Sequence, residues 1–436
     1  MNDNEEIIDW LKNSKTVVML GIGGVGMRAL AAWLKANGKT VIGADVDWNF
    51  IKDDQRVEAY KLWPEDEIAR HWQKAELVIC SDAIPQQHPL RAVAVKEEKT
   101  VLSYAQALGA ISRQYFTIAI AGTHGKSSTT ALLANIFIDA GLDPTVIVGA
   151  SVPGWPQGNA RIGQGKYLIA EADEYMNHFL ELAPRMIVLT SIDFDHPDWF
   201  NSVDDVADSM RKFTGLLPGG GKLIIGGDVW DKYGDKLGKR ELATVVSWPQ
   251  AHLDLQLTGE HMQRNAWLAI TAAKEFTVAE DKARRAVEKF AGLGRRLETI
   301  GYWQGMEIIS DYGHHPRELE ATWQGFNEAH SYKKVLVVFE PHTAERLTSF
   351  FNDFVRVLAD MSAGVLITPV YQARETSGQG KTSRDLYEKL RGVKKDVRLL
   401  KDWEKLPDTL KQLAGDYDIL LAFTAGKLDQ KLRKLK

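Results

Sequence analysis

The stretch from Ile118 to Thr130, IAIAGTHGKSSTT, reads as a buried β-strand, a glycine-containing turn and the start of a helix. Gly122 and Gly125 allow backbone N–H groups to turn toward an anion, and a helix beginning near Lys126 adds the positive end of its dipole. Lys126 can reach the β- and γ-phosphates of a nucleoside triphosphate, and the Ser127 hydroxyl can ligate the accompanying Mg²⁺. The stretch therefore predicts a phosphate-binding loop with ATP and Mg²⁺ as its ligands, against the alternative of a purely structural turn.

Polar side chains follow the next two predicted strands of the same segment. The strand 167–171 ends in Glu171, and carboxylates at a strand exit beside a triphosphate are natural ligands for Mg²⁺. The strand 186–191 leads to His196, which can hold a second metal ion or position a substrate carboxylate. The alternatives are a solvated acidic turn and a structural histidine. We predict that Glu171 and His196 converge on the phosphate-binding loop.

A second glycine-rich turn lies near the N-terminus. The apolar run 16–20 leads into GIGGVG at 21–26, and Asp45 follows a second strand, 40–44. This pattern is typical of dinucleotide-binding sites, but such a turn at a helix N-terminus holds any diphosphate, including that of a uridine-diphosphate sugar. Ser81 follows a third strand at the edge where ligands of open α/β sheets bind. A nicotinamide cofactor and a UDP-sugar both remain open at this point.

The rest of the chain alternates strand and helix, which predicts a third α/β segment with a parallel sheet. His314 and Arg346 each follow a predicted strand, where such a sheet faces a cleft. The adjacent His314 and His315 fit a helix cap equally well. Arg295, Arg296 and Arg346 are candidates for neutralising phosphate charge. The predicted strands are 307–311, 334–339, 364–368 and 418–423, and the predicted helices are 316–330, 346–361 and 383–390.

The composition limits the classes of function. A chain of 436 residues exceeds what one hydrophobic core usually serves, so we expect two or three domains. A net charge of -4 gives no reason to expect a nucleic-acid or membrane partner. The single Cys80 excludes a disulfide framework within the chain. No apolar run reaches the roughly 18 residues of a membrane span, and no signal pattern is visible. We therefore expect a cytoplasmic protein.

Eight ordered motifs resemble those of one enzyme family, the Mur ligases of peptidoglycan synthesis, and the resemblance covers nearly the whole chain. The motifs are GIGGVGMRALA (21–31), AGTHGKSSTT (121–130), EADE (171–174), DFDHPD (193–198), GLGRRLE (292–298), DYGHHP (311–316), FEPHTAER (339–346) and VYQARE (370–375). The resemblance implies an α/β fold with three domains. These are a Rossmann-like UDP-sugar-binding domain at 1–112, a central P-loop ATPase-like domain at 113–295 and a Rossmann-like amino-acid-binding domain at 296–436.

The resemblance also implies a reaction. The lactyl carboxylate of UDP-N-acetylmuramate attacks the γ-phosphate of ATP, and the amine of L-alanine then displaces phosphate from the resulting acyl phosphate. The implied catalytic residues are Lys126, Glu171, His196, His314 and Arg346, and the implied metal ligands are Ser127, Glu171 and His196. The implied ATP contacts are Gly122, Thr123, His124, Gly125, Lys126, Ser127, Ser128, His261, Asn265 and Arg296. The implied UDP-sugar contacts are Gly21, Gly23, Gly24, Val25, Gly26, Asp45, Ser81 and His124.

Three other functions fit parts of this pattern. EADEY, DFDHPD and RRLE also resemble the related murein peptide ligase, which attaches a recycled tripeptide to the same sugar, whereas DYGHHP, PHTAER and VYQARE favour L-alanine as the amine. A nicotinamide oxidoreductase would use the turn at 21–26 and leave Lys126, Glu171 and His196 without a purpose. A non-catalytic relative would bind the UDP-sugar and ATP as a sensor. We expect a monomer or a weak homodimer.

Overall fold

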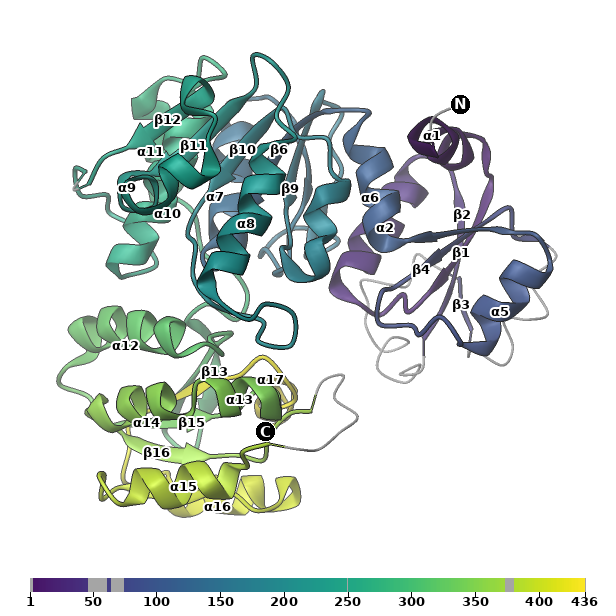
Figure 1. Cartoon of the computed structure of the whole chain (residues 1–436). Helices are drawn as coiled ribbons and strands as arrows, with labels where there is room; N and C mark the ends of the chain where they lie inside the picture. Colours follow the sequence, from purple (N-terminus) through teal and green to yellow (C-terminus); the bar gives the residue numbers. More distant parts are fainter. Residues whose placement is uncertain (1–2, 46–60, 64–73, 249, 373–379, 436) are drawn as a thin grey trace. The chain divides into compact units, whose positions relative to one another are not determined.

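The computed structural model describes residues 3–45, 61–63, 74–248, 250–372 and 380–435. These residues form three β-sheets with flanking helices, distributed over two compact units. The first unit comprises residues 1–193, 204–254 and 264–290 and contains a five-stranded and a seven-stranded sheet. The second unit comprises residues 194–203, 255–263 and 291–436 and contains a six-stranded sheet. Figure 1 shows the helices that cover each sheet.

The N-terminal sheet of the first unit has the strand order β3-β2-β1-β4-β5, with all strands parallel. Its strands are β1 (Thr16–Leu20), β2 (Thr40–Ala44), β3 (Lys61–Trp63), β4 (Leu77–Cys80) and β5 (Thr100–Ser103), and its helices are α1 (Asp3–Asn13), α2 (Val25–Ala36), α5 (Pro89–Lys96) and α6 (Tyr104–Ser112). The strand order reverses beside β1, which places the turn after β1 at the point where open α/β sheets bind ligands. The predicted strands 16–20 and 40–44 are confirmed, and the predicted third strand before Ser81 is β4.

The central sheet has the order β12-β11-β10-β6-β9-β7-β8, and only β8 runs antiparallel to its neighbour. Because β6 lies between β9 and β10, the carboxyl ends of these two strands flank the loop that follows β6. The strands are β6 (Phe116–Ala121), β7 (Thr145–Ile147), β8 (Ala160–Arg161), β9 (Tyr167–Glu171), β10 (Met186–Leu189), β11 (Lys222–Gly226) and β12 (Ala243–Val246). The helices are α7 (Lys126–Asp139), η3 (Tyr175–Glu181), α8 (Val203–Thr214), α9 (Gly227–Leu237), η4 (Arg240–Leu242), α10 (Glu260–Lys274) and α11 (Glu280–Glu288).

The six-stranded sheet of the second unit has the order β13-β14-β18-β15-β16-β17. The predicted parallel arrangement is confirmed for the four predicted strands, β14, β15, β16 and β18. Two further strands were not predicted: β17 pairs parallel with β16, and β13 pairs antiparallel with β14. The strands are β13 (Glu298–Trp303), β14 (Met306–Asp311), β15 (Val335–Phe339), β16 (Gly364–Ile367), β17 (Val397–Leu399) and β18 (Ile419–Phe423). The helices are α12 (Pro316–His330), α13 (Ala344–Ser349), α14 (Phe351–Asp360), α15 (Ser383–Arg391), η5 (Trp403–Lys405), α16 (Leu406–Leu413) and α17 (Leu428–Arg433).

The sheet of the second unit is buried on both of its faces. Alternate residues of β15 belong to two separate hydrophobic clusters: Val335, Val337 and Phe339 pack on one side, and Leu336 and Val338 pack on the other. Such two-sided burial is what a parallel sheet covered by crossover helices requires. The apolar strand residues therefore make the sheet an internal layer. The polar residues that can form a functional site are those that follow the carboxyl ends of the strands.

One predicted helix of this unit is wrong in its extent. The stretch 346–361 was expected to form a single helix, but it is divided into α13 and α14 at Phe350, whose backbone leaves the helical region. Helix α13 also begins earlier than predicted, because the Thr343 hydroxyl accepts a hydrogen bond from the Arg346 N–H and caps it.

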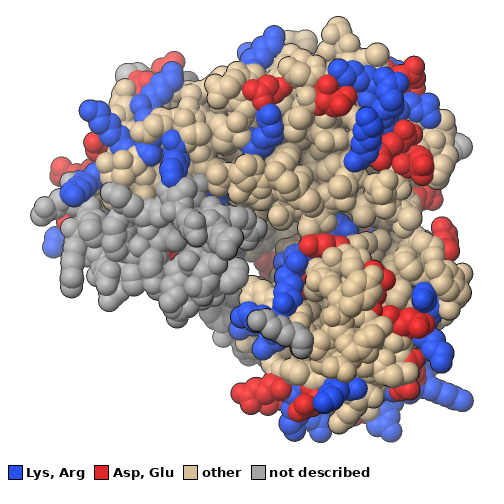
Figure 2. Space-filling model, turned by 180° about the vertical axis from the view of Figure 1, so that it is seen from behind, with Lys and Arg blue, Asp and Glu red and all other residues tan. Residues whose placement is uncertain are grey.

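The charged surface and the helices bear on possible partners. Figure 2 shows basic and acidic side chains interspersed with uncharged surface on the face that it presents. Across the described ranges, no helix is long and apolar enough to cross a membrane.

Cys80 lies buried at the end of β4, where burial raises the pKa of its thiol to about 11.

Candidate active site

The phosphate-binding loop, residues 122–128, connects β6 to α7 as predicted. Gly122 and Gly125 have φ values of 130° and 83°, which residues other than glycine rarely adopt. A Cβ on Gly125 would lie 2.5 Å from the Asn265 Oδ1 atom, so a glycine is required on steric grounds as well. The structure thus brings Asn265, a predicted nucleotide contact, directly against the loop. A backbone shaped in this way, ending at a helix N-terminus, fits an anion.

We expect Gly125→Ala to weaken ATP binding at least about ten-fold, because the added methyl group meets Asn265 and strains a left-handed backbone. Titration of the purified protein with a fluorescent ATP analogue measures this. Gly141→Ala is the matched control: Gly141 has a φ of 77° just after the other end of α7, but open space surrounds its Cβ position. An equal loss of affinity in both variants would contradict the prediction.

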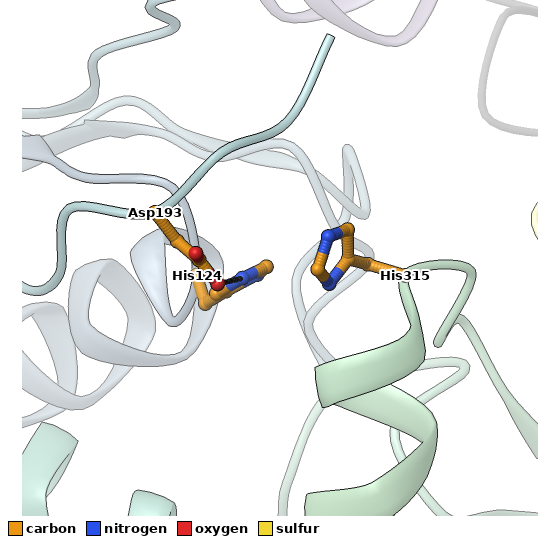
Figure 3. A group of neighbouring side chains, drawn as sticks. All are labelled: His124, Asp193 and His315. Carbon is orange, nitrogen blue, oxygen red and sulfur yellow. Dashed lines mark hydrogen bonds and ion pairs between the residues drawn. The ribbon is translucent and has the colours of Figure 1, made fainter. Parts of the chain in front are cut away.

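Hydrogen bonds attach the phosphate-binding loop to the residues that follow β10. The Thr123 hydroxyl donates to the Asp193 carbonyl oxygen at 3.1 Å and accepts from the Asp193 N–H at 3.0 Å. The His124 N–H donates to the Ser191 hydroxyl at 2.8 Å, and the His124 ring lies 3.1 Å from the Asp193 carboxylate (Figure 3). His315, also labelled in that figure, comes from the second unit. Ser191 and Asp193 were not predicted, although their position beyond the strand adjacent to β6 is a usable signal.

Lys126 is held by both the loop and a carboxylate. Its ammonium group donates to the carbonyl oxygens of Gly122 at 2.7 Å and Thr123 at 3.1 Å, and it lies 2.9 Å from the nearer oxygen of Glu174. Burial alone would lower the pKa of Lys126, but the nearby carboxylates of Glu174, Asp173 and Glu171 outweigh burial and raise it. Lys126 is therefore a permanent cation at the loop. Glu174 was not predicted as a site residue.

Ser127 and Glu171 meet as the sequence predicted. The Ser127 hydroxyl donates to the Glu171 carboxylate at 3.0 Å, and the other oxygen of that carboxylate accepts from the Gly149 N–H at 2.6 Å. A hydroxyl and a carboxylate side by side at the start of α7 are the oxygen donors that Mg²⁺ prefers beside a triphosphate. Ser128 is buried and is the third residue of α7, so it lies in the first turn at the open N-terminus of that helix.

The N-terminal glycine turn connects β1 to α2. Gly21 has a φ of 77°, and a Cβ there would lie 2.8 Å from the Cβ of Ser81, so the turn packs closely on the loop after β4. The Gly23 N–H donates to the Asp45 carboxylate at 2.9 Å. Gly24 is the N-cap of α2, and Val25 is its first residue. All of the predicted UDP-sugar residues therefore lie around the N-terminus of one helix or on the two neighbouring strand ends, except His124.

A buried charge cluster surrounds Arg346 in the second unit. The Arg346 guanidinium donates from Nε and Nη2 to the same Asp195 oxygen, at 3.0 and 2.7 Å, and its Nη1 lies 3.1 Å from the His342 Nδ1 atom. His196 is adjacent, because its N–H donates to the Asp195 carboxylate at 2.7 Å. Thr343, the cap of α13, has a φ of 63°, which is strained for a β-branched residue. Such strain is typical of functional segments.

The protonation states in this cluster follow from burial and charge. Burial by itself would raise the pKa of the Asp195 carboxyl, but Arg346 outweighs burial and holds it well below its usual value. Burial and then the positive charge of Arg346 lower the pKa of His314 to about 4. Burial and then His314 lower the pKa of His342 to about 2. At neutral pH the cluster therefore contains one ion pair and two neutral imidazoles, of which His342 already uses its Nδ1 lone pair to accept a hydrogen bond from Arg346.

The remaining predicted residues lie at element ends. Arg296 stacks on the Tyr312 ring, with 5.7 Å from its guanidinium carbon to the ring centre, and His261 lies in the first turn of α10. His314 is fixed by its own loop, since its Nδ1 lies 3.1 Å from the Tyr312 carbonyl oxygen. His196, His261, Arg296, His314 and Arg346 belong to the second unit, whereas the loop residues, Glu171 and Asn265 belong to the first. Their assembly into one active site stays a prediction.

Comparison with known proteins agrees with this geometry. Three family models match the chain: the catalytic domain of the Mur ligase family at 16–116, the Mur ligase middle domain at 120–245 and the Mur ligase glutamate ligase domain at 295–426. A UDP-N-acetylmuramate--L-alanine ligase from Caldicellulosiruptor saccharolyticus is 32% identical over 94% of this chain and 96% of its own length. The enzyme of the same name from Geobacter sp. strain M21 is 32% identical over 94% of this chain and 95% of its own length.

Solved structures show the same fold. A UDP-N-acetylmuramate-alanine ligase from Thermotoga maritima matches with a TM-score of 0.80 at 22% identity, covering 96% of this chain and 98% of its own. A murein peptide ligase from Psychrobacter arcticus matches with a TM-score of 0.71 at 20% identity, covering 97% of this chain and 98% of its own. The family models, the two relatives and these structures together extend over nearly the whole chain. The chain belongs to the Mur ligase family.

Proposed function

We propose that the protein is an ATP-dependent ligase that joins L-alanine to UDP-N-acetylmuramate through an amide bond. Relatives named for this activity match the chain over almost its full length at about one third identity. The observation that carries the chemistry is the meeting of Ser127 and Glu171 beside Lys126 at the N-terminus of α7. That arrangement suits the transfer of a phosphoryl group from ATP.

The ATP site in this proposal is built from the phosphate-binding loop. Its N–H groups and Lys126 bind the phosphates, while Ser127 and Glu171 hold Mg²⁺, which supplies positive charge against the transferring phosphoryl group. His261 and Asn265, one turn apart on α10, contact the adenine, and Arg296 binds phosphate charge. The contact of Gly125 with Asn265 supports this placement, because it sets that turn of α10 next to the loop.

The reaction takes place in two steps. The sugar carboxylate attacks the γ-phosphate to give an acyl phosphate and ADP, and the L-alanine amine then attacks the acyl carbon and expels phosphate. Lys126 stabilises the negative charge in the first step. His196 holds the sugar carboxylate and Arg346 contacts the substrates. His314 is neutral at physiological pH and can accept the proton that the attacking amine loses.

The domains have separate tasks in this proposal. Residues 1–112 bind the UDP-sugar at the turn after β1, residues 113–295 bind ATP, and residues 296–436 bind the amino acid. Each of these ranges contains one of the three sheets, which supports the division. Closure of the third domain excludes water, which would otherwise hydrolyse the acyl phosphate.

The experiment that tests the function is an assay of phosphate release with ATP, Mg²⁺ and UDP-N-acetylmuramate. We expect L-alanine to support turnover with a kcat/KM at least about ten-fold above glycine or L-serine, since a missing or added group in a fitted pocket costs about that much. The tripeptide L-alanyl-D-glutamyl-diaminopimelate is the discriminating alternative. Release with the tripeptide alone would make the protein a recycling ligase. Release with none of the amines, or tight NADH binding in place of ATP, would overturn the proposal.

A further inference from the structure

Tyr104 lies against the N-terminal glycine turn in the first unit. It is the first residue of α6, and a Cβ built on Gly26 would lie 2.7 Å from its ring and 2.8 Å from its hydroxyl oxygen. Gly26 is the second residue of α2, so its N–H is one of the donors that a helix leaves without an intrahelical partner. The Tyr104 hydroxyl is therefore placed beside the open N-terminus at which the UDP-sugar diphosphate is proposed to bind.

The hydroxyl is also available. Within the part of the chain that the structure describes, no group forms a hydrogen bond with it, although it lies among polar residues. The preceding Ser103 does have partners, because it forms a capping box with Gln106. Its N–H donates to the Gln106 side chain, and its hydroxyl accepts from the Gln106 N–H. Tyr115, beyond the other end of α6, accepts a hydrogen bond from the Trp33 indole at 3.0 Å. A half-buried phenol whose hydroxyl forms no hydrogen bond within the described residues is free to donate one to a bound ligand.

The surroundings fix the role that this phenol can have. Burial, followed by the charges of Asp173, Glu171 and Asp82, raises the pKa of Tyr104 above its ordinary value. The group therefore stays protonated at neutral pH and can serve as a donor. Glu171 and Asp173 also act on the phosphate-binding loop, through Ser127 and Lys126, whereas Asp82 follows β4 beside the N-terminal glycine turn. Tyr104 therefore lies beside the N-terminal glycine turn and within the influence of carboxylates that face the phosphate-binding loop. A ligand that reaches from one turn toward the other passes this residue.

We propose that the Tyr104 hydroxyl donates a hydrogen bond to the diphosphate of the UDP-sugar at the N-terminus of α2. This inference rests on the proposed function, since it takes the UDP-sugar as the ligand of that turn. Tyr104 acts here as a binding residue that adds a neutral donor to the backbone N–H groups of the turn. No sequence motif pointed to it, because its position depends on α6 packing beside α2.

Tyr104→Phe tests the inference, because it removes the hydroxyl and keeps the ring. Calorimetric titration with UDP and with UDP-N-acetylmuramate, without ATP, should show about ten-fold weaker binding of both ligands, as expected for a lost hydrogen bond to a charged group. The affinity for ATP should stay within two-fold. In turnover, KM for the UDP-sugar should rise by about the same factor while kcat changes little.

Tyr233→Phe is the matched control. The Tyr233 hydroxyl on α9 is buried and likewise lacks a hydrogen-bond partner among the described residues, so its loss should leave binding of both UDP ligands unchanged. Unchanged UDP affinity in Tyr104→Phe, with normal turnover, would overturn the inference and leave the proposed function intact. Weakening of UDP-N-acetylmuramate without weakening of UDP would also overturn it, since the contact would then be to the sugar. If the unmutated protein binds neither UDP ligand, the proposed function fails first.

Discussion

Replacement of Lys126 by methionine is expected to lower kcat for phosphate release by about 10³-fold, since a preorganised charge facing the developing negative charge is the main contribution of such a site. Lys126 is the cation that contacts the loop carbonyl oxygens of Gly122 and Thr123, and its pKa is raised, so it is fully charged throughout the working pH range. Methionine keeps an unbranched side chain of nearly the same length and removes the charge together with the ammonium hydrogen bonds. Steady-state kinetics with saturating ATP and UDP-N-acetylmuramate measures the loss.

The buried partner of Lys126 requires a second variant. Loss of the lysine leaves the Glu174 carboxylate, which is 1% exposed, without its cation, and this can lower stability. The double variant Lys126→Met/Glu174→Gln removes that buried charge and should fold more stably while remaining inactive. Lys222→Met, which breaks an exposed ion pair with Glu275, should retain kcat within two-fold. A kcat for Lys126→Met within ten-fold of the unmutated protein would show that the loop does not carry the phosphoryl transfer.

The local parts of this site could be predicted from the sequence. The strand, turn and helix around residues 118–130 form from neighbouring residues. The glycines and Lys126 therefore predict the loop without knowledge of any tertiary contact. The meeting of Ser127 with Glu171 also followed, because two parallel strands that both precede ligand loops bring their carboxyl ends to one edge. Here the strand pattern alone determined which side chains meet.

Other contacts could not be predicted, because they depend on loop conformations and long-range packing that the periodicity of apolar residues does not encode. Glu174 reaches Lys126 in a segment where Met176 and Asn177 both adopt left-handed conformations, φ 52° and 58°, which asparagine tolerates but methionine rarely adopts. The pairing of Asp195 with Arg346 joins residues that are 151 positions apart in the chain. The break between α13 and α14 was missed because the helical pattern of apolar residues continues across it. Tertiary packing decided each of these cases.

Replacement of Arg346 by methionine is expected to destabilise the second unit by about 3–5 kcal/mol, which is the usual cost of leaving a buried charge without its partner. Arg346 and Asp195 have side chains that are only 6% and 8% exposed, and two of the three guanidinium nitrogens contact one Asp195 oxygen. Urea unfolding at pH 7, followed by circular dichroism, measures the change. Arg356→Met, which removes an exposed pair with Glu320 in the same unit, should cost less than about 1 kcal/mol.

The pH dependence identifies the charge as the cause. Because Arg346 depresses the pKa of Asp195 in the folded protein, its stabilisation is fully present above the pKa of an unfolded aspartate, about 3.9, and is lost as the pH falls through the lower folded value. The stability gap between the unmutated protein and Arg346→Met should therefore be largest near neutral pH and narrow below about pH 4. Arg346→Met/Asp195→Asn should recover part of the lost stability, since no buried charge then remains at that position. A gap that is constant from pH 7 to pH 3 would assign the loss to packing of the arginine side chain instead of to its ion pair.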